Sequence, residues 1–146
     1  MASPYFSLIN GTLVLNSRTF TGFSDGSDAF SIDPIVIANV KYGADGQFVA
    51  IGTGTRGTNA SLKLLPNSDD VKFLSSIAEQ NKKGAGIVLN GSYVNHLNGS
   101  QLKLVTGIIT SYQPYPTQGK GEIGDMEYII AFAEVNGDFS AASFTN

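Results

Sequence analysis

The sequence predicts a mainly β domain, an antiparallel β-sandwich or barrel with one flanking α-helix and one long protruding loop or hairpin. Three observations lead to this fold class. Asn-Gly pairs, which tolerate the positive φ angles of tight hairpin turns, lie between apolar segments rich in β-forming residues. One segment has apolar residues at helical spacing. Another segment is rich in glycine and follows neither periodicity.

The strands are predicted around four Asn-Gly pairs. These pairs are Asn10-Gly11, Asn90-Gly91, Asn98-Gly99 and Asn136-Gly137. Lys63 and Lys103 each lie between two leucines, and this alternation gives their strands one solvated and one buried face. The expected strands are residues 6–9, 12–15, 18–23, 29–32, 58–66, 86–90, 91–96, 101–112 and 126–135.

A single helix is predicted from about residue 68 to residue 83. Asn67 is placed to cap its N-terminus, and residues 69–70 put two acidic side chains in the positive first turn. Residues 82–83 are lysines in the negative last turn, and Gly84 favours termination. The apolar stripe that would pack on the sheet comprises Val71, Phe73, Leu74, Ile77 and Ala78.

Length and composition indicate one soluble domain that spans residues 1–146. The chain has no cysteine, which excludes disulfides, zinc-thiolate sites and thiol nucleophiles. Only 14% of its residues are charged and its net charge is −3, so we expect either a large core or faces covered by other subunits, and no surface that grips nucleic acid. No secretion signal or membrane span is expected from its N-terminus or its apolar runs, so synthesis is expected in a cytoplasm.

The run from Gly52 to Gly57 has the G-x-G-x-x-G spacing of the dinucleotide-binding fingerprint. That fingerprint requires a helix after the glycines, whereas residues 58–66 alternate like a strand and end at a proline. No cofactor is therefore expected. We predict instead a protruding arm over about residues 36–57, with its glycine-rich part from Tyr42 to Gly57, which a partner orders. Residues 113–124 are expected to form a second exposed loop.

Residues suited to catalysis or metal binding are few and scattered. His96 is the only histidine and lies beside a predicted turn, where exposure on the surface is expected. Carboxylates cluster within residues 25–28, 69–70 and 122–127, without the spacing of a calcium-binding loop. The chain has no tryptophan to form a platform for sugars. We predict no enzymatic activity and no metal site, and a small β-sandwich enzyme or sugar-binding module remains an alternative.

Three segments resemble the tail tube proteins of contractile-tailed bacteriophages. They are Pro4–Leu13, Gly43–Gly52 and the helix from Asp69, and the resemblance extends over nearly the whole chain. It implies a protomer of two packed antiparallel sheets and one helix, with six copies closing into a ring and rings stacking into a tube. Phage DNA and the tape measure protein would occupy the lumen without specific binding. The tail sheath would lie outside, with the baseplate and tail terminator at the ends and no membrane contact.

The resemblance also implies that the protein is made in the host cytoplasm, resides in the virion, and uses its arm to reach the adjacent ring. Residues assigned to this contact are Tyr42, Gly43, Asp45, Gly46, Phe48, Gly52, Gly54, Arg56 and Gly57. We predict that Arg56 pairs with an aspartate or glutamate of a neighbouring subunit. A tail terminator, a baseplate-hub ring and the tube of a contractile injection or secretion system remain alternatives, because fold alone does not separate these roles.

Overall fold

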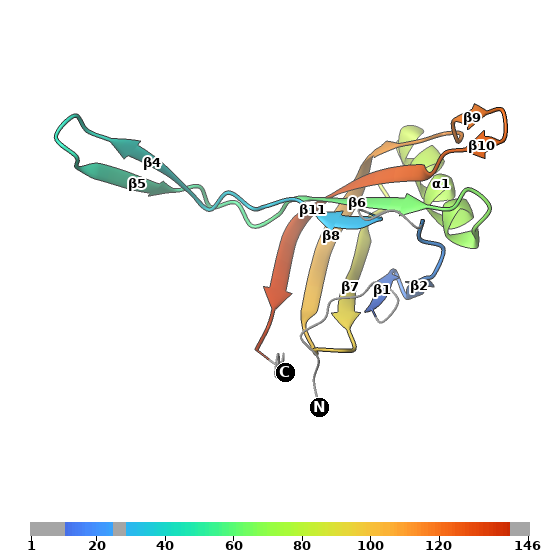
Figure 1. Cartoon of the computed structure of the whole chain (residues 1–146), viewed down its shortest axis with the longest axis horizontal. Helices are drawn as coiled ribbons and strands as arrows, with labels where there is room; N and C mark the ends of the chain where they lie inside the picture. The colour runs from blue at the N-terminus through green and yellow to red at the C-terminus, as the bar shows by residue number, and fades with distance from the viewer. Residues whose placement is uncertain (1–10, 25–28, 141–146) are drawn as a thin grey trace.

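One seven-stranded antiparallel sheet forms the body of the molecule (Figure 1). The structure, a computed structural model, describes residues 11–24 and 29–140 of the chain. The strands lie in the order β2-β1-β7-β8-β11-β6-β3. Their bounds are β1 (Gly11–Leu15), β2 (Arg18–Phe20), β3 (Phe30–Ile32), β6 (Asn59–Leu64), β7 (Leu89–Asn95), β8 (Gln101–Tyr112) and β11 (Met126–Asp138).

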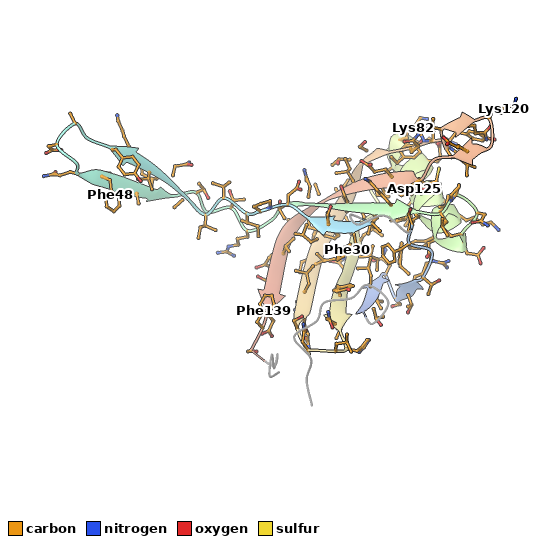
Figure 2. All side chains as sticks on the ribbon, viewed as in Figure 1. Phe30, Phe48, Lys82, Lys120, Asp125 and Phe139 are labelled. Carbon is orange, nitrogen blue, oxygen red and sulfur yellow. The ribbon has the colours of Figure 1, made fainter. Side chains whose placement is uncertain are left out.

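Two hairpins and one helix extend from this sheet. The hairpins are β4 (Ala38–Tyr42) with β5 (Phe48–Gly52), and β9 (Gln118–Gly119) with β10 (Glu122–Ile123); the helix is α1 (Asp69–Lys82). Phe48 lies on the β4–β5 hairpin far from the sheet, whereas Lys120 lies at the opposite end of the molecule, between β9 and β10 (Figure 2). The long axis of the molecule therefore runs from one hairpin to the other.

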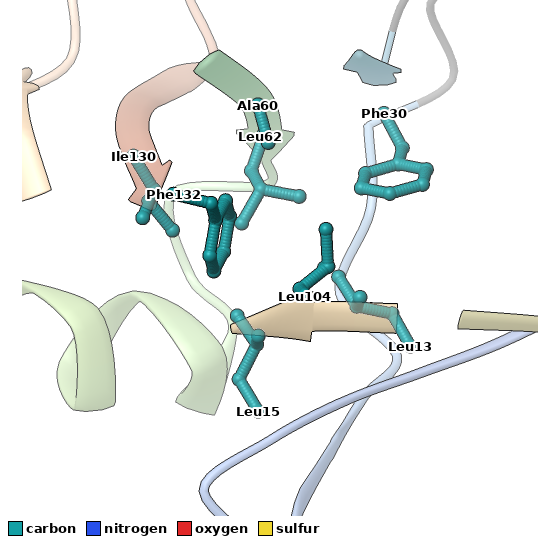
Figure 3. Close-up of a pocket in the computed structure, with 8 residues that line it drawn as sticks. All are labelled: Leu13, Leu15, Phe30, Ala60, Leu62, Leu104, Ile130 and Phe132. Atoms are coloured by element: carbon teal, nitrogen blue, oxygen red, sulfur yellow. The ribbon is translucent and has the colours of Figure 1, made fainter. Parts of the chain in front are cut away.

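The sheet curls into a half-barrel, so that side chains from distant strands meet inside it. The ring of Phe30 on β3 lies 5.0 Å from the ring of Tyr93 on β7, although three strands separate them in the sheet. The fold-class prediction is confirmed in its barrel form, because one continuous curled sheet provides both walls of the core. The side chains that converge there leave no space for a water molecule (Figure 3); they are Leu13, Leu15, Phe30, Ala60, Leu62, Leu104, Ile130 and Phe132.

Alternation of buried and exposed residues accounts for the strands that the sequence predicts best. On β6 and β8 the leucines beside Lys63 and Lys103 point toward the core, and β8 has the predicted bounds. Residues 86–96 were expected to form two strands but contain the single strand β7, and β11 extends three residues beyond its predicted end. The expected strand over residues 6–9 lies outside the described residues.

The Asn-Gly pairs mark a turn at one place and strand interiors at two others. Gly99 has a φ of +80° in the β7–β8 turn, as predicted. The predictions of turns at Asn90 and Asn136 were wrong, because both residues lie within strands. The Oδ1 atom of Asn90 accepts a hydrogen bond from the Thr106 amide at 2.7 Å, at the place where the register between β7 and β8 is irregular. The β1–β2 turn uses Asn16 and Ser17, with φ of 50° and 66°, and Asn10 lies outside the described residues.

The helix begins and ends close to its predicted bounds, although its N-cap differs. The N-cap residue is Ser68, not Asn67, and its side chain makes no capping hydrogen bond. At the C-terminus, Gly84 has a φ of +94° and its amide donates to the Asn81 carbonyl at 3.0 Å. The next amide, that of Ala85, donates to the Gln80 carbonyl at 3.0 Å, which completes a Schellman motif.

Candidate functional site: the protruding arm

The predicted arm is a two-stranded hairpin that projects from the half-barrel (Figure 1). Every residue from Val36 to Arg56 is exposed, so no described part of the body covers it. The strands pair from Ala38 with Gly52 to Tyr42 with Phe48. The arm, defined here as residues 36–57, therefore has regular backbone structure and no apolar core of its own.

Three of the predicted site residues lie at the tip of the arm and form its turn. The Gly43 amide donates to the Gln47 carbonyl at 2.6 Å, and the Gly46 amide donates to the Gly43 carbonyl at 3.2 Å. Gly46 has a φ of +87°, which favours glycine. The Oδ1 atom of Asp45 accepts a bond from the Gln47 amide at 3.3 Å. Gly43, Asp45 and Gly46 thus close the hairpin.

The two faces of the hairpin differ in chemistry. Cross-strand partners point to the same side, and successive residues point to opposite sides. The aromatic face comprises Ala38, Val40, Tyr42, Phe48 and Ala50, and the aliphatic face comprises Asn39, Lys41, Val49 and Ile51. On the aromatic face, the rings of Tyr42 and Phe48 have centroids 6.0 Å apart.

The glycines at the base of the arm have three separate roles. Gly52 ends β5. Gly54 has a φ of +71°, and a Cβ there would meet no described atom within 4 Å. A Cβ on Gly57 would overlap the carbonyl oxygens of Phe132 and Ala133 on β11, so this position requires glycine for close approach of two backbones.

Hydrogen bonds fix the arm to the body on either side of Gly57. The Arg56 carbonyl accepts a bond from the Val135 amide at 2.9 Å, and the Thr58 carbonyl accepts one from the Phe132 amide at 3.0 Å. The Thr53 hydroxyl donates to the Val36 carbonyl at 2.6 Å and continues the hairpin toward its base. The glycine run leads directly into β6, which confirms the predicted strand and leaves no helix terminus to face a phosphate.

The structure brings the nine predicted site residues together on the arm, from its tip to its base. Arg56 is exposed, and its side chain has no ion-pair partner within residues 11–24 and 29–140; its contact with a neighbouring subunit stays a prediction. Sequence reasoning missed Val40, Val49 and Ile51. Their signal was the alternation over residues 38–42 and the continuous apolar run over residues 48–51, which the flanking glycines obscured.

The predicted carboxylates that lie within the described residues form no common site. Asp69 and Asp70 lie in the first turn of α1, as predicted, and Asp70 is also buried and accepts bonds from the Arg18 side chain and two backbone amides. The Tyr112 hydroxyl donates to Glu79, and this bond lowers the pKa of Glu79 and raises the pKa of Tyr112. The acidic residues of the 122–127 cluster are not buried, and Asp25 and Asp28 lie outside the described residues.

The remaining polar features of the described residues form no chemical centre. His96 is exposed, as predicted, and shares a hydrogen bond with Thr12 at 2.8 Å. Within the described part of the chain, His, Asp and Glu side chains form no group of three that could hold a metal ion. A hollow of about 420 Å³ lies over β7, β8 and β11, and its lining includes Ser92, Leu102, Lys103 and Asp138. Among the described residues no helix is long and apolar enough to cross a membrane.

Comparisons with solved structures identify the same fold in contractile injection systems. The PVC sheath/tube terminator of an extracellular contractile injection system, in its extended state, gives a TM-score of 0.61 at 7% identity. The match covers 92% of this chain and 96% of that chain. The tube-terminating cap of the anti-feeding prophage gives a TM-score of 0.56 at 10% identity, over 92% of this chain and 91% of that one. At these identities the likeness concerns the fold alone.

A sequence comparison identifies the family. A search of curated proteins gave no match. The model of the family described as tail fiber protein gp32 matches residues 7–136, which include both the half-barrel and the arm. The resemblance to phage tail proteins is thereby confirmed as a tail-protein family, whereas the narrower assignment to the tail tube stays a prediction. This chain belongs to the tail fiber protein gp32 family.

Proposed function

We propose that this protein is a non-catalytic structural component of a contractile phage tail, which assembles into hexameric rings that stack as the inner tail tube. The observation that carries the proposal is the arm, a hairpin exposed over its whole length with apolar side chains on both faces. Contiguous exposed apolar surface of this kind is typical of a protein–protein interface. An arm that points away from its own body needs another molecule to cover it.

The half-barrel supports ring formation. Its outermost strands, β2 and β3, are only three residues long, and the sheet is open between them. Open sheet edges carry unpaired backbone groups, which neighbouring copies in a closed ring would cover. Arms at one end of each copy would then link successive rings, which is a heterologous contact that generates a filament. The sheath, baseplate, terminator and tape measure proteins are the partners that this role entails, and the virion is its location.

Excision of the hairpin tests the proposal. Ile37 and Thr53 are joined by a backbone hydrogen bond at 3.0 Å, so an Asn-Gly turn in place of residues 38–52 closes the chain without moving the arm's base. Excision from Tyr42 to Gly57 is less suitable, because Gly57 is packed on β11. The excised variant should keep a β-rich circular dichroism spectrum and the wild-type melting temperature but form no filaments in electron micrographs. Filaments of normal length from this variant would contradict the proposal.

A terminator or cap ring is the second candidate function. The two similar solved structures described above are of terminating components, a sheath/tube terminator and a tube-terminating cap. Electron microscopy of the purified wild-type protein distinguishes the two functions. Long hollow filaments favour the tube, whereas single rings that do not stack at high protein concentration favour the terminator.

A further inference from the structure

Both faces of the arm carry large, exposed apolar side chains, and from this we infer that each arm lies between two other copies of the chain. The exposed fractions are 75% for Tyr42 and 63% for Phe48 on the aromatic face. They are 63% for Val49 and 65% for Ile51 on the aliphatic face. The inference rests on the proposed function and adds to it the number of molecules that each arm contacts.

A hairpin that lies on one surface has one dry and one wet face. In such a hairpin apolar side chains alternate with polar ones along each strand. Strand β5 lacks this alternation, because Phe48, Val49, Ala50 and Ile51 are apolar on both sides. One docking surface would cover the aromatic face and leave Val49 and Ile51 in water. Covering both faces requires a second surface.

The two faces also call for different surfaces. The aromatic face has no charged or amide side chain, and the hydroxyl of Tyr42 is its one polar side-chain group. It therefore suits an apolar recess. The aliphatic face includes Asn39 and Lys41, whose amide and ammonium groups need hydrogen-bond partners when water is removed. It suits a surface with an acceptor or a carboxylate beside apolar contacts.

Charge complementarity favours further copies of this chain as the two partners. The arm has Lys41 and Arg56 against Asp45, a net charge of +1. The whole chain has a net charge of −3, so the remaining residues carry −4. Acidic residues of the body are available for pairing, since Glu122, Asp125 and Glu134 have no ion-pair partner within the described residues. An assembly of identical chains also contains as many bodies as arms, so every arm can find partners.

Photo-crosslinking tests the two-partner geometry directly. Benzoyl-phenylalanine is placed at position 42, at position 49, or at both. The full-length substituted protein is assembled with a large excess of unsubstituted protein, so that reactive arms are isolated from one another, and is then irradiated and analysed by denaturing electrophoresis. Each single replacement should give covalent dimers. The double replacement should give trimers as well, because its two faces contact different molecules. Dimers without trimers from the double replacement, or no crosslink from position 49, would overturn the inference.

Substitutions on each face provide the second test. Tyr42→Ser on the aromatic face and Val49→Ser on the aliphatic face should each raise the protein concentration needed for assembly by about tenfold or more. Thr55→Ser, an exposed position between the hairpin and Gly57, is the matched control and should leave that concentration unchanged. If Val49→Ser assembles like the wild type, the arm has one partner face and the inference fails while the proposed function stands. A wild-type protein that stays monomeric at all concentrations would overturn the proposed function itself.

Discussion

At the scale of single residues, Asp70 has a structural role that its sequence neighbours do not indicate. It is only 2% exposed, and it accepts bonds from the Arg18 Nε atom at 3.1 Å and from the Thr21 and Gly22 amides at 2.9 and 2.8 Å. The Arg18 guanidinium also lies 5.4 Å from the centroid of the Phe73 ring, on the same helix as Asp70. Asp70 therefore ties β2 and the segment after it to α1.

Replacement of this carboxylate should destabilise the protein strongly. Asp70→Asn removes the negative charge that pairs with Arg18. It also replaces one carboxylate oxygen by an NH2 group, which would face the hydrogen-bond donors that Asp70 now binds. We expect the free energy of unfolding to fall by about 3 kcal/mol, the scale for breaking a buried ion pair. Asp69→Asn is the matched control, because the Asp69 side chain is 80% exposed and its ion pair with Lys72 contributes less than about 1 kcal/mol. Urea unfolding of both variants measures the difference, and equal losses would contradict this role.

At the scale of elements, the sequence predicts those whose local pattern and tertiary surroundings agree. The helix and β8 were predicted within one residue, because their apolar periodicity is long and regular. Asn136 was predicted as a turn but pairs with Lys103 within β11, since a neighbouring strand was available along its whole length. Asp70 lies in the first turn of the helix, as predicted, but the groups that donate hydrogen bonds to it are distant in sequence. Such long-range partners leave no local signal.

Gly57 is the residue on which the attachment of the arm to the sheet depends. Gly57→Ala would place a Cβ against the β11 carbonyl oxygens of Phe132 and Ala133, which are backbone atoms that cannot rotate away. We expect a loss of about 2 kcal/mol in the free energy of unfolding, as for overpacking in a well-packed interior. The control is Gly119→Ala, since a Cβ on Gly119 meets no described atom within 4 Å. Chemical denaturation measures the free energy of unfolding of both variants. A Gly57→Ala variant as stable as the wild type would contradict the close packing of Gly57 on β11.

At the scale of the whole molecule, the sequence predicts that an arm protrudes but does not predict how it is organised. The glycine-rich composition of residues 36–57 indicates an excursion from the sheet, which the structure confirms. The pairing of Tyr42 with Phe48 then decides which side chains share a face. The arm's apolar side chains contact no described part of the body, so no periodicity relates them to the core. These side chains therefore have no apolar partner within the described part of the body, and the sequence offers no core pattern from which to predict their arrangement.

At the scale of the whole molecule, net charge also predicts how the channel proposed above would interact with DNA. Each copy adds a net charge of −3, and its nine basic residues are outnumbered by twelve acidic ones. A lumen that lets DNA slide must not neutralise phosphates, because each neutralised phosphate adds affinity through counterion release. We expect the assembled protein to retain no double-stranded DNA in a filter-binding assay at about 50 mM salt, where such contacts are strongest. A sequence-independent DNA-binding protein serves as the positive control. Retention that weakens steeply between about 50 and 200 mM salt would indicate a basic lumen and contradict the role of a passive conduit.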